Sequence, residues 1–229
     1  MATYNGERFL REQIESILAQ LGECDELIIS DDGSTDNTLE IITSFDDDRI
    51  KLFHNEGNSG VNHNFENALK HTMGDMIFFS DQDDIWIDGK VKACVEALKE
   101  CDCVFHDGIT INGEGEVIAN SFYINKIPSG NFLKNLWKTS YMSCRMAINR
   151  RTLKYVLPYP SDLKCYQEGW VASIIAIKSN VKFITFKGIQ YRRHGCNASC
   201  TSSKSPYSLK EKFLIRLNLL TNVIKRLLK

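Results

Sequence analysis

The sequence lacks several features that mark common protein classes. No apolar run approaches the roughly 20 residues that a membrane-spanning helix needs. The formal net charge is -1, so nothing global indicates nucleic-acid binding, and no nucleic-acid partner is expected. The first residues hold neither a basic nor an apolar stretch, so no secretory signal is expected, and we predict a cytoplasmic protein.

Common catalytic signatures are also missing. There is no G-x-x-x-x-G-K-[ST], no G-x-G-x-x-G after a strand, no H-E-x-x-H and no G-x-S-x-G. Eight cysteines are present, but they are scattered, and neither Cys101/Cys103 nor Cys196/Cys200 has the C-x2-C spacing of a zinc site. Reduced, mostly structural thiols are therefore expected.

The first hundred residues alternate between helical and strand patterns. Apolar residues at helical spacing predict helices, and short apolar runs that end in turn residues predict buried strands. The predicted helices cover residues 7–20, 36–45, 60–71 and 88–100, and the predicted strands cover residues 27–30, 50–54, 76–80 and from 103 onward. This alternation indicates βαβ units, hence an α/β fold with a mainly parallel sheet.

The second half of the chain is less regular. Asn112-Gly113 predicts a hairpin, and apolar patterns predict strands at 142–148 and 181–186, a helix at 167–177 and another at 209–228. No linker-like stretch separates the halves, so we expect one domain over residues 1–200, followed by a linker and helix over 201–229. A parallel sheet of this kind needs a strand before Thr3, so the first strand is expected to be truncated.

Three polar clusters directly follow predicted strands. They are Thr3-Tyr4-Asn5, Asp31-Asp32-Gly33-Ser34 and Asp81-Gln82-Asp83-Asp84. Ligands of such sheets bind at the carboxyl ends of the strands, so these clusters are expected to converge in one cleft.

Asp81-Gln82-Asp83 has the pattern of a site for a divalent cation. Side chains alternate along an extended backbone, so the two carboxylates can point the same way. Mg²⁺ or Mn²⁺ held by one or two carboxylates completes its shell with waters and substrate phosphates. The alternative is a solvated acidic loop, and for an isolated D-x-D that alternative is the better one.

The other candidate positions also have structural alternatives. Asp31 can form an Asx turn or accept a hydrogen bond from a base or ribose. Backbone N–H groups of residues 58–64 can face phosphate or only begin a helix. A lone histidine such as His194 is more often structural than a ligand, and Trp170 is more often a core residue than a sugar platform. Glu168 can simply be a favourable charge at a helix start.

Taken together, the clusters resemble those of the family 2 glycosyltransferases, which have the GT-A fold. The resemblance covers roughly residues 1–200 and rests on the order of its motifs. They are Met1-Ala2-Thr3-Tyr4-Asn5-Gly6, Ile29-Ser30-Asp31-Asp32-Gly33-Ser34-Thr35-Asp36, residues 58–64, Ser80-Asp81-Gln82-Asp83-Asp84-Ile85-Trp86 and Tyr191-Arg192-Arg193-His194-Gly195. The Asp-Gln-Asp-Asp-Ile-Trp form looks like the bacterial rhamnosyltransferase-like branch that builds surface polysaccharides.

The resemblance implies an inverting enzyme that moves a sugar from a nucleotide-diphosphate donor to a glycan or lipid-linked acceptor. It implies Mn²⁺ or Mg²⁺ at Asp83, with His194 as a further metal or diphosphate contact. The residues that it implies for binding the nucleotide-sugar are Thr3, Tyr4, Asn5, Glu7, Asp31, Asp32, Asn58, Gly60, Asn64, Asp81, Gln82 and Trp170.

Glu168 marks a departure from the family pattern. Members usually have Glu-Asp or His-Asp where this chain has Gln167-Glu168, so Glu168 stands at the position of the catalytic base. Its carboxylate reaches one methylene further, and a displacement of about 1 Å can cost about a hundredfold in rate. The alternative is thus a catalytically weak relative that acts in binding or assembly. A nucleotidyltransferase is disfavoured because the first strand carries no Gly-rich phosphate loop.

The C-terminal segment has the pattern of a basic amphipathic helix. Phe213, Leu217, Leu220, Ile224 and Leu227 recur at steps of four and three among several lysines and arginines. Such a helix can lie on an anionic membrane surface. Packing against the body or against a second subunit in a homodimer is at least as good an explanation.

Overall fold

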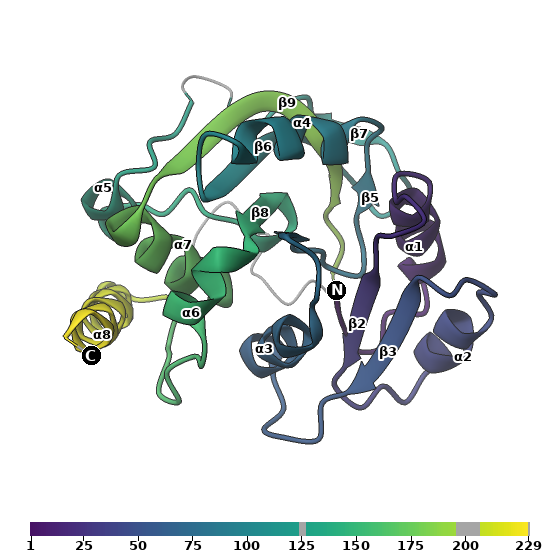
Figure 1. The fold of residues 1–229 in the computed structure, drawn as a ribbon, viewed down its shortest axis with the longest axis horizontal. Coiled ribbons are helices and arrows are strands. Elements are labelled where there is room, and N and C mark those ends of the chain that lie inside the picture. Colours follow the sequence, from purple (N-terminus) through teal and green to yellow (C-terminus); the bar gives the residue numbers. More distant parts are fainter. Residues whose placement is uncertain (124–126, 196–206, 229) are drawn as a thin grey trace.

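The computed structural model describes residues 1–123, 127–195 and 207–228. Its first sheet is parallel, with the strand order β1-β2-β3, and the helices α1, α2 and α3 flank it (Figure 1). The elements are β1 (Ala2–Thr3), α1 (Leu10–Leu18), β2 (Leu27–Asp31), α2 (Thr38–Thr43), β3 (Ile50–His54) and α3 (Val61–His71). The predicted elements of this half are confirmed, with bounds that differ by a few residues.

The second sheet has the order β4-β8-β6-β9-β5, with β7 beside β6. Its strands are β4 (Met76–Phe78), β5 (Ile85–Trp86), β6 (Cys103–Ile111), β7 (Val117–Ala119), β8 (Met146–Asn149) and β9 (Val181–Arg192). Only β6 and β9 pair in parallel; the other neighbours are antiparallel. The expectation of a mainly parallel sheet therefore holds for the first sheet and is wrong for the second, which is mixed. There β4 and β6 pair antiparallel with β8, and β5 pairs antiparallel with β9, across long stretches of chain.

Two predicted strands have different bounds in the structure. The stretch predicted as a strand at 142–148 begins with a 3-10 turn (Ser143–Arg145), and β8 follows it. The strand predicted at 181–186 continues to Arg192, because its pairing with β6 extends to Ile111. The predicted hairpin at Asn112-Gly113 is confirmed and connects β6 to β7.

The two sheets meet beside the first strand. The Ala2 N–H donates to the Ser80 carbonyl at 3.4 Å, so β1 lies next to the segment that leaves β4. The loops after β1, β2 and β4 consequently gather at one edge, as the order of the clusters predicts.

The main core lies between the second sheet and the C-terminal helices. The remaining elements are α4 (Lys90–Leu98), α5 (Phe132–Trp137), a 3-10 turn (Arg150–Thr152), α6 (Leu153–Val156), α7 (Gln167–Lys178) and α8 (Leu209–Leu227). Trp170 of α7 is fully buried there, and its indole N–H donates to the Val156 carbonyl at 2.9 Å. This hydrogen bond satisfies the polar end of a large buried ring.

The helix α8 packs against α5 and α7 and buries little of its own surface (Figure 1). It begins at a capping box, in which the Ser208 hydroxyl accepts from the Glu211 N–H and the Glu211 carboxylate accepts from the Ser208 N–H. Residues 201–206 of the predicted linker lie outside the described residues. Within the described ranges, no helix has the length and apolar character required to cross a membrane.

Candidate nucleotide-sugar site

A cavity of about 640 Å³ lies where the three polar clusters meet. Nine of the predicted site residues line it: Thr3, Tyr4, Asp32, Gly60, Asn64, Asp81, Gln82, Asp83 and Glu168. Segments far apart in sequence thus contribute to one concave, mixed polar and apolar surface, which is the usual form of a small-molecule site.

The loop after β2 presents Asp32, and not Asp31, to this cavity. The Asp31 carboxylate is fully buried and accepts hydrogen bonds from the N–H groups of Gly33 (3.0 Å) and Ser34 (2.8 Å) and from the Thr3 hydroxyl (2.8 Å). These bonds form the Asx turn that the sequence offered as the alternative. Because this carboxylate faces inward, the structure does not place it for contact with a base; the next residue, Asp32, lines the cavity instead.

The helix α3 is tied to the same loop. The Asp32 carboxylate accepts from the Gly60 N–H at 2.7 Å, and Gly60 has a φ of 118°, a backbone conformation that favours glycine. The Asn64 side-chain amide donates to the Thr3 carbonyl at 3.0 Å. The Gly60 N–H, one of those predicted to face phosphate, is therefore already bonded within the protein.

Gln82 joins the first cluster to the third. Its amide oxygen accepts from the Tyr4 N–H at 2.8 Å, and its amide N–H donates to the Tyr4 carbonyl at 2.9 Å. A Cβ atom on Gly6 would lie 2.5 Å from this amide, so a side chain at position 6 would push Gln82 away. The pair fixes the distance between the two loops that line the cavity.

Besides Asp31 and His194, four predicted site residues lie outside the cavity wall. The Asn5 side chain accepts from the Thr35 N–H at 2.8 Å, the Glu7 carboxylate accepts from the Asn37 N–H at 3.0 Å, and the Asn58 carbonyl accepts from an asparagine side chain at 3.1 Å. These three brace the surrounding loops. Trp170 is 0% exposed in the core, so the structure corrects its predicted role as a sugar contact: its ring supports the helix that carries Glu168.

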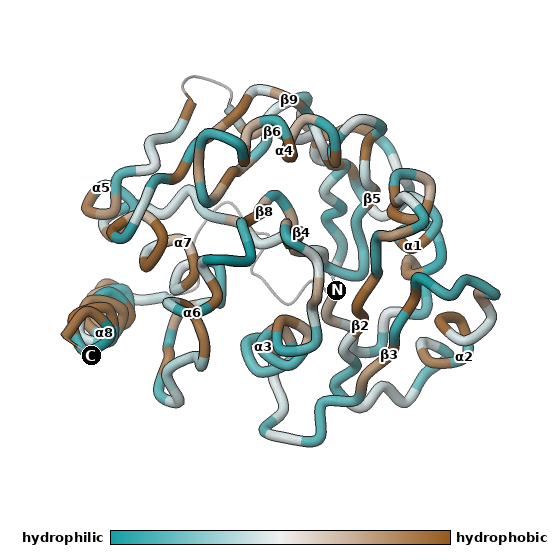
Figure 2. Tube along the Cα trace, viewed as in Figure 1, coloured by the Kyte–Doolittle hydropathy of each residue, from teal (hydrophilic) through white to brown (hydrophobic). Residues whose placement is uncertain are grey.

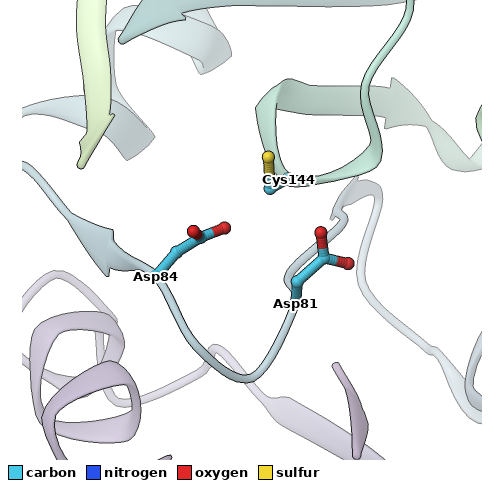
Figure 3. Close-up of side chains that lie close together, drawn as sticks. All are labelled: Asp81, Asp84 and Cys144. Carbon is cyan, nitrogen blue, oxygen red and sulfur yellow. The ribbon is translucent and has the colours of Figure 1, made fainter. Parts of the chain in front are cut away.

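Asp81 and Asp84 of the acidic loop after β4 lie close to Cys144 of the 3-10 turn Ser143–Arg145. Their ligand atoms lie within 4.8 Å of one another, and the carboxylates point to the side of the loop on which Cys144 lies (Figure 3). Burial and the neighbouring Asp83 charge raise the pKa of Asp81 to about 7, and burial also raises the pKa of Asp84 well above its ordinary value. Each carboxyl therefore needs a compensating charge to stay ionised.

Lys90 already supplies a cation to this group. Its side chain is 0% exposed, its ammonium donates to the Cys144 carbonyl at 3.1 Å, and it lies 3.9 Å from the Trp86 ring centroid. Burial lowers the pKa of Lys90 to about 8, while the nearby carboxylates act in the opposite direction. A metal ion among Asp81, Asp84 and Cys144 would meet this ammonium, so the group is better explained as an internal charge network.

Asp83 and His194 form the pair best suited to a metal. Asp83 Oδ2 and His194 Nε2 are 2.8 Å apart, and Asp83 lines the cavity. A carboxylate oxygen is a ligand that suits both Mn²⁺ and Mg²⁺, and an imidazole nitrogen is a ligand that suits a transition-metal ion better than Mg²⁺. Arg192 positions the pair from β9, because its guanidinium donates to the Asp83 carbonyl at 3.1 Å and its N–H donates to Asp84 at 2.9 Å.

Glu168 faces the same cavity from the first turn of α7. The residue keeps partial exposure to the cavity, but its carboxyl group lies in desolvated surroundings, and this burial raises its pKa to about 8. A carboxyl whose pKa lies near the working pH suits proton transfer.

Replacement of Lys90 is expected to destabilise the fold. Lys90→Met leaves the Asp81 and Asp84 carboxylates without their buried counter-charge, which costs about 3 kcal/mol of unfolding free energy at pH 7.5. The loss is expected to be smaller at pH 5.5, because both carboxyls can then take up protons. Urea denaturation measures it, with Lys92→Met on the exposed face of the same helix as control. Equal stability of the two variants at pH 7.5 would contradict the counter-charge role.

Sequence reasoning missed three residues of this site. Ser143 donates to both oxygens of Asp81 at 3.2 Å, Lys90 balances the acidic loop, and Arg192 holds its far side. Only Arg192 had a signal, since it stands in the motif that contains His194. Ser143 and Lys90 come from segments that look like an ordinary strand start and an ordinary helix start.

Comparison with known proteins gives relatives over the whole chain. The family described as Glycosyl transferase family 2 matches residues 1–157. The Escherichia coli UDP-Glc:alpha-D-GlcNAc-diphosphoundecaprenol beta-1,3-glucosyltransferase WfgD is 28% identical, over 99% of this chain and 87% of its own. The Shigella flexneri dTDP-rhamnosyl transferase RfbG is 40% identical over 43% of this chain and 36% of its own.

Among solved structures, S. aureus TarS in complex with UDP-GlcNAc superposes with a TM-score of 0.74 at 20% identity. The match covers 96% of this chain and 65% of the TarS fragment. Because TarS and this protein share so little sequence, the superposition establishes the GT-A fold alone. The family match covers more than half of the chain, and the motifs that carry it line one cavity. The chain therefore belongs to glycosyl transferase family 2.

Proposed function

We propose that this protein is an inverting, metal-dependent glycosyltransferase that uses a nucleotide-diphosphate sugar and acts in the synthesis of a bacterial surface polysaccharide. The observation that carries the proposal is the single cavity lined by both Asp83, which contacts His194 at 2.8 Å, and Glu168. The remaining wall, from Thr3, Tyr4 and Asp32, is available to the nucleoside. The catalytic unit would comprise residues 1–200.

Each group has a role in the transfer. Asp83 and His194 would hold a Mn²⁺ or Mg²⁺ ion, which neutralises the charge of the leaving diphosphate. Glu168 takes the proton of the acceptor hydroxyl as that oxygen forms its bond to the anomeric carbon. The bond from this carbon to the diphosphate oxygen breaks on the opposite face, so the anomeric configuration inverts. The Tyr4–Gln82 pair keeps the donor side of the cavity at a fixed width.

The acceptor is proposed to be a glycan or a lipid-linked sugar, and the protein to work in the cytoplasm at the inner face of the cell membrane. The supporting observation is α8, whose exposed face carries Leu209, Phe213 and Leu217 beside lysines. Binding of the protein to anionic vesicles, and its loss in Phe213→Glu, tests the contact. A dimer in solution that the same substitution dissociates would identify α8 as a subunit interface instead.

Donor recognition has a direct test. A panel of UDP-, GDP- and dTDP-sugars is offered with Mn²⁺, and both donor hydrolysis and calorimetric binding are measured. We expect one nucleotide class to bind with an affinity that falls by at least about tenfold in excess chelator, since the diphosphate then lacks its counter-charge. Absence of metal-dependent binding for every donor would overturn the proposed function.

A further inference from the structure

A second cavity adjoins the nucleotide-sugar cavity. Its volume is about 710 Å³, and it lies among α5, α7 and α8. The two cavities share the residues Ser59, Gly60, Val61, Tyr166 and Glu168. Glu168 therefore stands at their junction, and a molecule in the second cavity can reach the carboxylate that the proposed reaction needs.

The second cavity is rich in positive charge. Lys138, Lys164, Lys212 and Arg216 line it, and Glu168 is the only acidic residue in its described wall. None of these cations forms a salt bridge with any residue in the described ranges. Arg216 is engaged by donating to the carbonyls of Leu136 and Trp137, which leaves the lysines as the groups suited to an anion.

The same cavity has an apolar wall that continues onto the surface. Leu136, Tyr141, Leu163, Ile215 and Leu219 contribute to the wall. Trp137 of this wall is 76% exposed, and Phe213, which follows Lys212 on α8, is 62% exposed. Both α5 and α8 carry hydrophobic segments (Figure 2). An exposed apolar strip beside a basic cavity marks a site for an amphipathic partner.

Resting on the proposed function, we propose that the second cavity binds the acceptor as a lipid-linked diphosphate. Lys138, Lys164 and Lys212 would contact the phosphates, the apolar wall would take the first units of the hydrocarbon chain, and the acceptor sugar would lie against Glu168. A neutral glycan would gain nothing from the three lysines, and a free nucleotide would gain nothing from the exposed strip. The ligand that matches both features carries phosphate and hydrocarbon together.

Farnesyl diphosphate is the probe for the test, used below its micelle concentration with saturating UDP and excess EDTA. The chelator removes the metal through which a diphosphate can bind near Asp83. We expect farnesyl diphosphate to bind, Lys212→Ala to weaken that binding by about tenfold, and Lys138→Ala/Lys212→Ala to weaken it further, since each ammonium–phosphate contact is charge-assisted. Farnesol, which lacks the phosphates, is expected to bind at least about tenfold more weakly.

Matched controls separate the possible results. Lys92→Ala, on the exposed face of α4, is expected to leave binding unchanged, and so is Asp83→Ala. The inference is overturned if the double lysine variant binds as the parent does, if farnesol binds equally well, or if Asp83→Ala removes the binding. Mn²⁺-dependent UDP binding is measured on the same samples. Its absence would overturn the proposed function itself, whereas its presence without farnesyl diphosphate binding would overturn only the acceptor site.

Discussion

Asp83→Ala is expected to lower sugar transfer by about a thousandfold or more, because several kcal/mol of charge stabilisation at the leaving diphosphate depend on the bound cation. Asp83 lines the cavity and lies 2.8 Å from His194, so its loss removes the carboxylate of the proposed metal pair. Calorimetric titration of UDP with and without Mn²⁺ measures the same change at the level of binding: the parent binds more tightly with the ion, and the variant binds equally weakly in both conditions.

The control for this substitution lies in the same part of the chain. Asp88 is exposed and does not line the cavity, so Asp88→Ala is expected to keep both activity and metal-dependent binding. Thermal denaturation of Asp83→Ala confirms that the variant is folded. A folded Asp83→Ala enzyme with unchanged turnover would remove the metal role from this residue.

Glu168→Gln is expected to lower transfer by about a thousandfold, the usual effect of removing a general base. Donor binding should not change, since the amide is nearly the same size and the Asp83–His194 pair is untouched. Glu168→Asp, which keeps a carboxylate one methylene shorter, should recover part of the rate. If Glu168→Gln retains full activity, Glu168 is not the base; if the parent itself binds donors but transfers no sugar, the protein is a weak relative that serves in binding or assembly.

The pKa of Glu168 makes two further results follow. The base must be ionised, and its pKa is raised from 4.5 to about 8, so transfer is expected to rise with pH and to level off above about pH 8.

The folded state also holds a proton that the unfolded state releases, so the parent loses stability as pH rises from 4.5 to about 8. Glu168→Gln removes this loss. Its unfolding free energy, measured by urea denaturation, should exceed that of the parent by about 4 kcal/mol at pH 8 and should match it at pH 4.5.

The sequence predicted the first half of the fold well, because each short apolar run there is bounded by turn residues. The strand at Ile50–His54 and the helix ending at His71 have the expected bounds. Strand direction in the second sheet was beyond reach, since the apolar runs at β4, β6 and β8 look alike whichever way their partners run. The 3-10 turn that places Ser143 against Asp81 likewise has no signal of its own.

The candidate site, like the fold, was only partly predictable from the sequence. The clusters at the strand ends predicted the cavity, but not which of two adjacent aspartates would line it. Asp31 and Asp32 differ by one position, and successive side chains of a strand point to opposite faces, so only the register decides that Asp31 faces inward. Lys90 was missed because a lysine at a helix start normally lies in solvent, whereas here the acidic loop and Trp86 enclose it.

The reciprocal amide bonds between Tyr4 and Gln82 have a consequence for exchanging parts between relatives. Tyr4 follows β1 of the first sheet and Gln82 follows β4 of the second, so their contact joins loops of the two sheets next to the Ala2–Ser80 hydrogen bond. Consider a chimera in which the first sheet comes from another family member. It then has a new loop at residues 4–6 but keeps Gln82. A side chain at position 6 of the new loop would collide with the Gln82 amide. Donor specificity should therefore transfer between relatives only when the loop at residues 4–6 and the loop that carries Gln82 are exchanged together.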